Sequence, residues 1–472
     1  MYRMYSFYKS IIFLLVSMLM LACSVGKNYK RPELGTPQQY TAAASGDSSI
    51  ATKSWKKFFV DTTLQRLIDQ ALASNFNLQL AIKRMEVAQE YAKQARLAWL
   101  PALNAQIGAS TNLPSENSLT GLSLKNFLGT NHLEDYTVGL NLSWEIDVWG
   151  KIRRQKEAAL ANYLQSYEAS RAVHTALVAQ MAHSYYNLLM MDAQLKIAQS
   201  NVLLSDSVVQ MMQLQKRAGE VTELAVQQAV TQKQNAMLLV PQLEQAMQLQ
   251  ENAIHLLSGE WPGLVARSAE LETSWIDDTL STGIPADLLS LRPDVRANER
   301  ALMAANARVG VAQANMYPTL NLTAAGGLNA FKASNWFMVP ASLFGTAAGG
   351  LLQPVFQRRL LRTQRNVAVL EREQRVIEFR QSVLTAAHEV TNAMVKLDKL
   401  KIQQQVANDR VELSEQAVKN ARLLFRSGLA NYLEVITAQN RALQAELDEA
   451  AIVRQLLSAR VELYQSLGGG WR

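Results

Sequence analysis

The chain has 472 residues, which is enough for two or three ordinary domains, and only 18% of them are charged. Its 22 glycines and 11 prolines are few for this length, so the composition favours long helices over extended loops. The formal net charge of +7 would permit contact with nucleic acid or an anionic membrane, but lysine and arginine are scattered and mixed with glutamate. We therefore interpret most of these charges as solvated helix faces and expect no nucleic-acid partner.

The first 22 residues have the pattern of a bacterial export signal. Arg3 and Lys9 give a positive start, and the apolar run over 11–21 is too short to cross a bilayer as a helix. A small residue precedes Cys23, the only cysteine, as in a bacterial lipobox. We expect Cys23 to be the first mature residue and to carry lipid; the alternative is ordinary cleavage near a chance cysteine. A single cysteine also excludes a disulfide framework.

Residues 23–60 are expected to form a lipidated N-terminal segment, and residues 61–258 a first structural repeat. The repeat begins with a helix near 61–100 and continues with a hairpin over 102–148. Apolar and polar residues alternate through both strands of this hairpin, over the length that a tilted strand needs to cross hydrocarbon. A soluble sheet packed on helices would alternate in the same way, but the export signal favours a membrane sheet. Aromatic residues gather at strand ends, where a membrane-interface girdle would lie: Trp99, Tyr136, Trp149, Tyr317, Trp336 and Phe337.

The helix after this hairpin is unusually long. It is predicted from about Lys151 to Arg217, roughly 67 residues, which corresponds to about 100 Å at 1.5 Å per residue. An ordinary globular domain needs no such helix. We expect Gly219 to end it in the left-handed conformation, so that the chain turns back into a shorter helix over 220–257.

The chain then repeats itself. Gly219 recurs as Gly428, and Leu257–Gly259 recurs as Ser466–Gly468 with the same spacing. Internal repetition predicts that the second copy has the same element order as the first. The remaining predicted parts are an equatorial linker over 259–286, a second repeat over 287–467 with its hairpin at 318–356 and its tip turn near Gly428, and a C-terminal tail over 468–472.

The long helix of the second repeat carries an apolar residue at nearly every seventh position. A seven-residue repeat enforces left-handed supercoiling, and the mostly small residues three positions later would let helices approach closely. The pattern therefore predicts a coiled coil. The seventh positions are Val369, Val376, Val383, Val390, Leu397, Val411, Val418 and Phe425, interrupted only by Gln404.

Four strands per chain cannot close a barrel alone. An open sheet edge in lipid leaves backbone groups unpaired, at a cost of several kcal/mol each. Two chains would give eight strands and little lumen, whereas three chains would give twelve and room for a channel. The predicted fold is therefore an α+β membrane protein with two structural repeats per chain, in which each chain makes a four-stranded contribution to a trimeric 12-stranded β-barrel and adds a long coiled coil.

Five motifs at matching spacing carry a family resemblance: Cys23–Pro32, Leu291–Arg296, Ala312–Pro318, Gly428–Val435 and Leu467–Trp471. They resemble the TolC-like outer-membrane factor family, in the lipoprotein branch that serves resistance-nodulation-division efflux systems. The resemblance implies a lipid-anchored homotrimer in the outer membrane of a Gram-negative bacterium, whose twelve-stranded β-barrel continues into the periplasm as a long coiled-coil α-helical barrel. It also implies a passive exit duct of a tripartite efflux pump, with a periplasmic adaptor (membrane fusion protein) and an inner-membrane resistance-nodulation-division pump as partners.

Resemblance and threefold symmetry together place the resting gate at the Gly428 tip. A ring of Glu434 carboxylates would narrow the pore and attract cations. Phe425 is a candidate apolar constriction, and Arg426 a candidate salt-bridge partner that holds the helices together. The alternatives are that Glu434 is only a solvated helix residue and Phe425 only the last heptad residue. Family members often carry a constricting Asp where this chain has Thr437, so its gate departs from the family pattern.

No catalytic constellation is apparent, and the five histidines lack metal-ligand spacing with cysteine or carboxylates. We expect no enzymatic activity, no cofactor and no resident metal. One alternative function is a periplasmic coiled-coil adaptor or structural protein of an export complex, which would need one helical hairpin and no alternating strand pairs. Another alternative is an exported enzyme, but no sequence motif supports it. The sequence leaves open the cargo, which could be a drug, a metal ion or another small molecule.

Overall fold

The computed structural model describes residues 25–35, 49–267, 270–272 and 287–471. The predicted signal peptide, Cys23 and much of the predicted linker over 259–286 lie outside these described residues. The chain divides into two compact units. The first comprises the described residues up to Pro32 with Val87–Leu164 and Arg300–Ile377, and the second comprises the described residues of Glu33–Glu86, Gln165–Glu299 and Glu378–Arg472.

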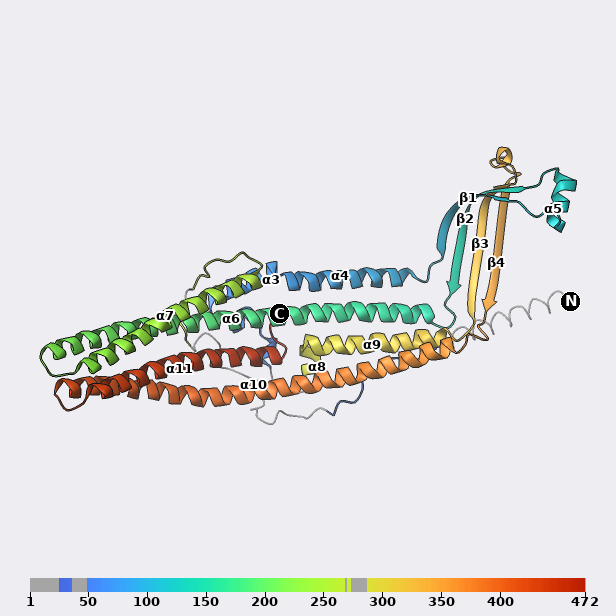
Figure 1. Ribbon diagram of the computed structural model, residues 1–472. Helices are drawn as coiled ribbons and strands as arrows, with labels where there is room; N and C mark the ends of the chain where they lie inside the picture. The colour runs from blue at the N-terminus through green and yellow to red at the C-terminus, as the bar shows by residue number, and fades with distance from the viewer. Residues whose placement is uncertain (1–24, 36–48, 268–269, 273–286, 472) are drawn as a thin grey trace. The chain divides into compact units, whose positions relative to one another are not determined.

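The two repeats have the same element order and nearly equal helix lengths (Figure 1). The first contains α4 (Phe76–Leu97), β1 (Ala102–Asn112), β2 (Leu133–Ile146), α6 (Lys151–Arg217) and α7 (Glu223–Ser258). The second contains α9 (Pro293–Ala314), β3 (Thr319–Ala330), β4 (Leu343–Leu352), α10 (Leu360–Arg426) and α11 (Tyr432–Ser466). Helices α4 and α9 have 22 residues each, α6 and α10 have 67 each, and α7 and α11 have 36 and 35. The repeat and the α+β composition predicted from the sequence are confirmed.

The predicted helix near 61–100 is in fact two helices, α3 (Thr62–Ser74) and α4. The break falls at Asn75, whose backbone is extended. Its side chain accepts a hydrogen bond from the amide of Leu78 at 3.0 Å and donates one to the carbonyl of Leu257 at 2.9 Å, so it caps α4 and ties the break to α7. Short elements that the sequence did not predict are η1 (Ile50–Thr52), α2 (Trp55–Phe58), α5 (Leu119–Ser123), η2 (Leu124–Leu128), η5 (Ala333–Asn335) and α8 (Leu288–Leu291).

The four strands form one antiparallel sheet in the order β1-β2-β3-β4. Glycines allow β2 and β3 to approach closely, because a Cβ on Gly327 would lie 2.1 Å from the carbonyl oxygen of Val138. The apolar face of β1 is open, with Leu103 61% and Ile107 76% exposed. Strand β4 ends at Leu352, before the predicted end of its hairpin at residue 356, since Pro354 cannot donate to a ladder.

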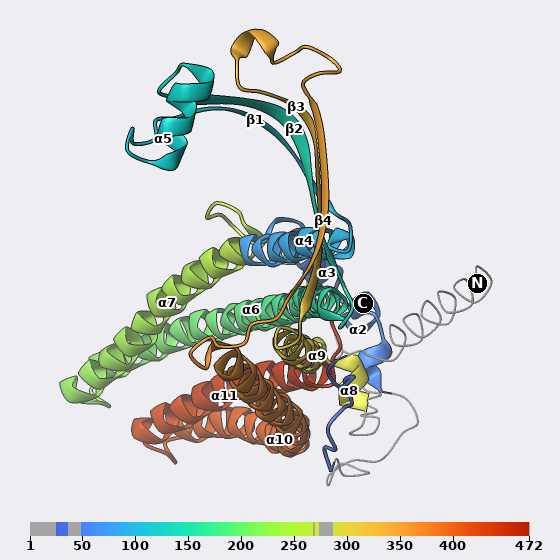
Figure 2. The same cartoon turned by 90° about the vertical axis from the view of Figure 1, so that its right-hand side faces the viewer.

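Aromatic side chains lie at both ends of this sheet, as the sequence predicted. At the end next to the long helices, Trp149 and Tyr317 stack with ring centroids 5.0 Å apart, and Trp149 donates a hydrogen bond to the carbonyl of Pro318 at 2.7 Å. At the opposite end, Trp336 lies 5.4 Å from the ring of Tyr136 and 5.0 Å from that of Phe337. Figure 2 shows α5 and the β3–β4 connection beyond this second end.

In the second unit, α6 runs alongside α7 and α10 alongside α11 (Figures 1 and 2). The predicted heptad frame of α10 is confirmed by burial at Val383, Val390, Leu397, Val418 and Phe425, and at the small or apolar positions Phe379, Ala386, Ala393, Leu400 and Ala407. Within the described ranges, the helices lack a stretch both long and apolar enough for a membrane span.

Candidate functional site

Two tip turns join the long helices to the shorter ones, and both have the same geometry. Gly219 and Gly428 have φ of 78° and 74°, in the left-handed region that penalises a Cβ. The amide of Glu220 donates to the carbonyl of Gln215 at 2.9 Å, and the amide of Leu429 donates to that of Leu424 at 2.9 Å. This six-residue hydrogen bond is the Schellman ending of a helix, so each glycine terminates its helix as predicted.

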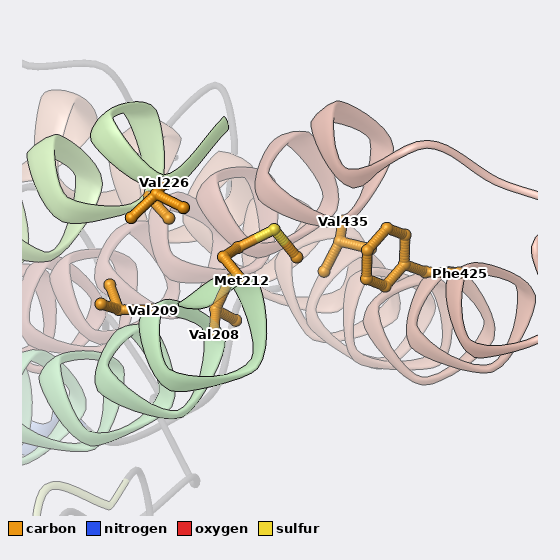
Figure 3. Close-up of a cluster of buried hydrophobic side chains, with 7 residues drawn as sticks. Val208, Val209, Met212, Val226, Phe425 and Val435 are labelled. Carbon is orange, nitrogen blue, oxygen red and sulfur yellow. The ribbon is translucent and has the colours of Figure 1, made fainter. Parts of the chain in front are cut away.

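A small hydrophobic cluster links the two hairpins beside these turns (Figure 3). Val208, Val209 and Met212 come from α6, Val226 and Ala229 from α7, Phe425 from α10 and Val435 from α11. Figure 3 shows Met212 reaching from α6 towards Val435. The two hairpins of one protomer are therefore packed together at the tip, rather than standing as independent arms.

Phe425 belongs to this cluster and is only 9% exposed. A side chain buried within its own protomer has little surface left to narrow a pore. Its position thus favours the alternative given above, in which Phe425 is the last heptad residue, and it offers no support for an apolar constriction at this residue.

Polar contacts reinforce the link between the hairpins. The hydroxyl of Tyr432 donates to the side-chain oxygen of Gln228, and the amide of Gln232 donates to that of Asn440. These contacts join α7 and α11, which follow the two tip turns. Because they are exposed amide and hydroxyl pairs, we expect each to contribute little stability and to break readily when the hairpins move.

The two tips differ in how their charges are compensated. In the first hairpin, Lys216 and Glu223 pair across the turn, and Lys233 contacts Asp206 at 2.6 Å. In the second, the nearest basic residue to the turn is Arg426, and among the described residues it has no carboxylate within ion-pair distance. The intrachain Arg426 ion pair suggested by the sequence is thus absent from the described protomer.

Glu434 lies in the first turn of α11 and is exposed. The backbone amide of Glu434 donates to the capping side chain of Asn431 at 3.1 Å. The carboxylate of Glu434 has no ion-pair partner among the described residues of the protomer. Thr437 lies one turn later, and its hydroxyl donates to the carbonyl of Leu433 at 2.8 Å. All four residues border a groove of about 700 Å³ between α10 and α11, together with Arg410.

Three further carboxylates face one another above the tip, and sequence reasoning missed them. Glu446 and Glu449 of α11 lie near Glu415 of α10; burial and these like charges raise the pKa of Glu446 and Glu449. The sequence gives no signal for this group, because it depends on the relative register of α10 and α11. The described residues contain no group of His, Cys, Asp and Glu placed to hold a metal ion.

Comparison with known proteins identifies a family with this arrangement of helices and strands. Residues 67–260 and 284–469 match the model of the outer membrane efflux protein family. The chain is similar to the toluene efflux pump outer membrane protein TtgF of Pseudomonas putida, with 30% identity covering 97% of this chain and 96% of TtgF. It is also similar to the cation efflux system protein CusC of Escherichia coli, with 27% identity covering 96% and 98%.

Solved structures agree with the sequence comparison. A membrane protein from Pseudomonas aeruginosa superposes with a TM-score of 0.88 at 27% identity, covering 94% of this chain and all of that one. The outer-membrane channel OprN superposes with a TM-score of 0.86 at 26% identity, covering 95% of this chain and all of that one. With both repeats matched and the same fold throughout, the chain belongs to the outer membrane efflux protein family.

Proposed function

We propose that the protein is the outer-membrane exit duct of a tripartite efflux pump, and that three copies close one channel. The observation that carries this proposal is the four-stranded sheet with β1 and β4 at its open edges. Each edge strand leaves a row of unpaired backbone groups, which is untenable in lipid. Because the number of strands is even, β4 of one copy can pair with β1 of the next and keep the antiparallel order. Such copies close into a ring.

The number of copies follows from the width that the barrel lumen needs in order to pass a solute. Two copies make an eight-stranded barrel, which side chains fill, whereas three make twelve strands with room for a solute. Native mass spectrometry of the protein in detergent tests this directly. A dominant trimer is the expected result, and a preparation holding only monomer and dimer would overturn the proposal.

In this arrangement the duct is passive, and energy and cargo selection come from an inner-membrane resistance-nodulation-division pump joined through a periplasmic adaptor. Support comes from the relatives, whose names include efflux of toluene and of cations. We propose small molecules or ions as cargo. Susceptibility profiling of a deletion strain against solvents, antibiotics and metal salts, with complementation by the intact gene, tests the duct and identifies its cargo. An unchanged profile for every compound would count against efflux.

We also propose that Cys23 carries lipid and anchors the mature chain in the outer membrane. This proposal is based on the position of Cys23 directly after the apolar run of the export signal. Intact-mass analysis of the purified protein should show a lipidated residue at the start of the chain. An unmodified N-terminus at another residue would refute lipidation. Since the sheet also holds the protein in the membrane, Cys23→Ser should lower the amount inserted without abolishing it.

The gate is proposed to lie at the Gly428 tip, with Glu434 and Arg426 as its charged residues. Both are exposed, and neither has an ion-pair partner among the described residues of its own protomer, so each is available to a neighbouring copy. In planar bilayers, Glu434→Gln should raise the open probability or lower cation preference. Glu412→Gln, an exposed acid farther along α10, is the control and should leave both unchanged. Wild-type behaviour of Glu434→Gln would move the gate to another ring of residues.

A further inference from the structure

The chain passes from a strand to a long helix twice. At the first of these junctions the charges are paired and the backbone is unstrained. Between β2 and α6, Glu145 pairs with Lys151 at 2.9 Å. Asp147 accepts hydrogen bonds from the amides of Ile152 and Arg153, both at 2.9 Å. The positive φ of 75° falls on Gly150, where no Cβ is strained.

The second passage, between β4 and α10, has none of these features. Arg358 and Arg359 occupy the left-handed region with φ of 47° and 68°, which disfavours residues with a Cβ. Arg362 and Arg365 follow within two turns, and all four arginines are exposed. The stretch 353–370 contains no Asp or Glu.

These four arginines, at positions 358, 359, 362 and 365, are called the basic junction below. Among the described residues, none of the four has a carboxylate within ion-pair distance. Cations at the start of a helix are also opposed by its macrodipole. Their arrangement therefore lowers the stability of the isolated protomer in two ways, and an anionic partner at these arginines would offset part of that cost.

Apolar side chains lie immediately before the basic junction. Leu351 is 70% exposed, Leu352 64%, Val355 94% and Phe356 84%. Such a patch beside four uncompensated cations has the composition of a membrane-surface element, in which apolar groups enter the acyl boundary and basic groups meet headgroup phosphates. A small soluble anion would use the charges but leave the apolar patch in water.

We propose that residues 351–365 form a docking surface for anionic phospholipid. The basic junction would bind headgroup phosphates, and Leu351, Val355 and Phe356 would lie against the acyl chains. Leu352, next to Leu351 on β4, points to the other face of the sheet. A neighbouring copy is a poor occupant. If β4 pairs with β1 of the next copy, the end of α4 of that copy comes beside the junction, and residues 91–101 include Lys93 and Arg96 but no Asp or Glu. The inference rests on the proposed membrane position of the sheet, and it adds a specific lipid partner to that position.

The test uses the full-length protein, stripped of lipid in an uncharged detergent. Dioleoyl phosphatidylglycerol or dioleoyl phosphatidylcholine is titrated in, and bound lipid is counted by native mass spectrometry. Two double variants remove charge: Arg358→Gly with Arg359→Gly, and Arg362→Gln with Arg365→Gln. The control, Lys399→Gln with Lys401→Gln, removes two exposed cations from a later part of the same helix.

Each arginine removed should weaken phosphatidylglycerol binding by about fivefold, hence roughly 25-fold for each pair, with little change for phosphatidylcholine. The control should match wild type. The glycine pair should also raise the melting temperature of the lipid-free protein, because it relieves the left-handed strain, so misfolding cannot produce the expected result.

Several outcomes overturn the proposal. Wild-type phosphatidylglycerol binding in both variants is one, and an equal loss for both lipids is another, because it would leave only apolar packing. A changed oligomeric state with unchanged lipid binding would make the surface a contact between copies. A changed ion selectivity with unchanged lipid binding would make it part of the duct wall. The titration measures lipid binding and not transport. Its result is therefore independent of whether the protein acts as an efflux duct.

Discussion

Replacing Phe425 by alanine tests whether the tip cluster couples the two hairpins. The substitution removes on the order of 100 Å² of buried apolar surface, which at about 25 cal/mol per Å² corresponds to about 2.5 kcal/mol. Buried Phe→Ala changes typically cost about 3–5 kcal/mol, and a site at the end of a long bundle can relax, so we expect a cost of about 3 kcal/mol. Because Phe425 belongs to the cluster in which side chains of both hairpins pack, both hairpins should loosen.

Hydrogen exchange measures this loosening locally. A cost of about 3 kcal/mol lowers protection by roughly a hundredfold for amides that open with the tip. We expect the loss near Met212 and Val226 as well as near Val435, and unchanged protection near Val390, far along α10. Leu423→Ala is the matched control, since Leu423 is two residues away on the same helix and 63% exposed.

Channel recordings separate packing from constriction. If Phe425 only packs the hairpins, Phe425→Ala should open more often with an unchanged unitary conductance. If it narrowed the pore, the unitary conductance would rise. Loss of protection confined to α10, with α6 and α7 unaffected, would refute the coupling of the hairpins through this cluster.

Four other outcomes follow from the structure. Gly428→Ala should cost about 1 kcal/mol from backbone strain alone, as nothing lies within 4 Å of the new Cβ, whereas Gly345→Ala, with equal space and no positive φ, should be nearly neutral in thermal melts. Glu446→Gln should raise the melting temperature at neutral pH. The pKa of Glu446 is raised in the folded protein, so the native state keeps its proton more tightly than the unfolded chain, and stability falls as pH rises above the ordinary value of 4.5; the variant should flatten that fall, and an unaltered pH profile would contradict the clustering of acids. Arg292→Leu should cost about 3–5 kcal/mol, because buried Arg292 pairs with Asp294 at 2.6 Å and Glu389 at 2.5 Å; a melting temperature equal to wild type would show that these pairs contribute nothing. Thiol labelling of whole cells should modify Ser118→Cys and spare Asn431→Cys, and the reverse pattern would invert the proposed topology.

Much of the fold could be predicted because it depends on local, repeated patterns. The 67-residue helix from Lys151 to Arg217 was predicted to the residue, since a strand pattern ends before it and a glycine turn follows it. Gly219 and Gly428 were identified from the repeat, and their left-handed φ explains why glycine stands there. The break at Asn75 was missed because it depends on a contact with Leu257, far away in the sequence.

The candidate gate was harder to predict, since it depends on which side chains face one another. Phe425 fits both a heptad position and a constriction in the sequence, and only its burial in the tip cluster favours packing. The group formed by Glu415, Glu446 and Glu449 arises from the relative register of α10 and α11, which heptad patterns within each helix leave undetermined. Glu434 remains a candidate whose role depends on neighbouring copies.

Disulfide cross-linking of the sheet edges tests most directly the claim that three copies close one channel. One cysteine is placed near the middle of β1, at Ala105, and a second near the middle of β4, at Ala347 or Ala348, so that both faces of the strand are sampled. Oxidation in membranes should link β4 of one copy to β1 of the next for one of the two pairs. The account predicts covalent dimers and trimers with nothing larger. A product that stops at dimer, or a ladder that continues beyond trimer, would contradict it.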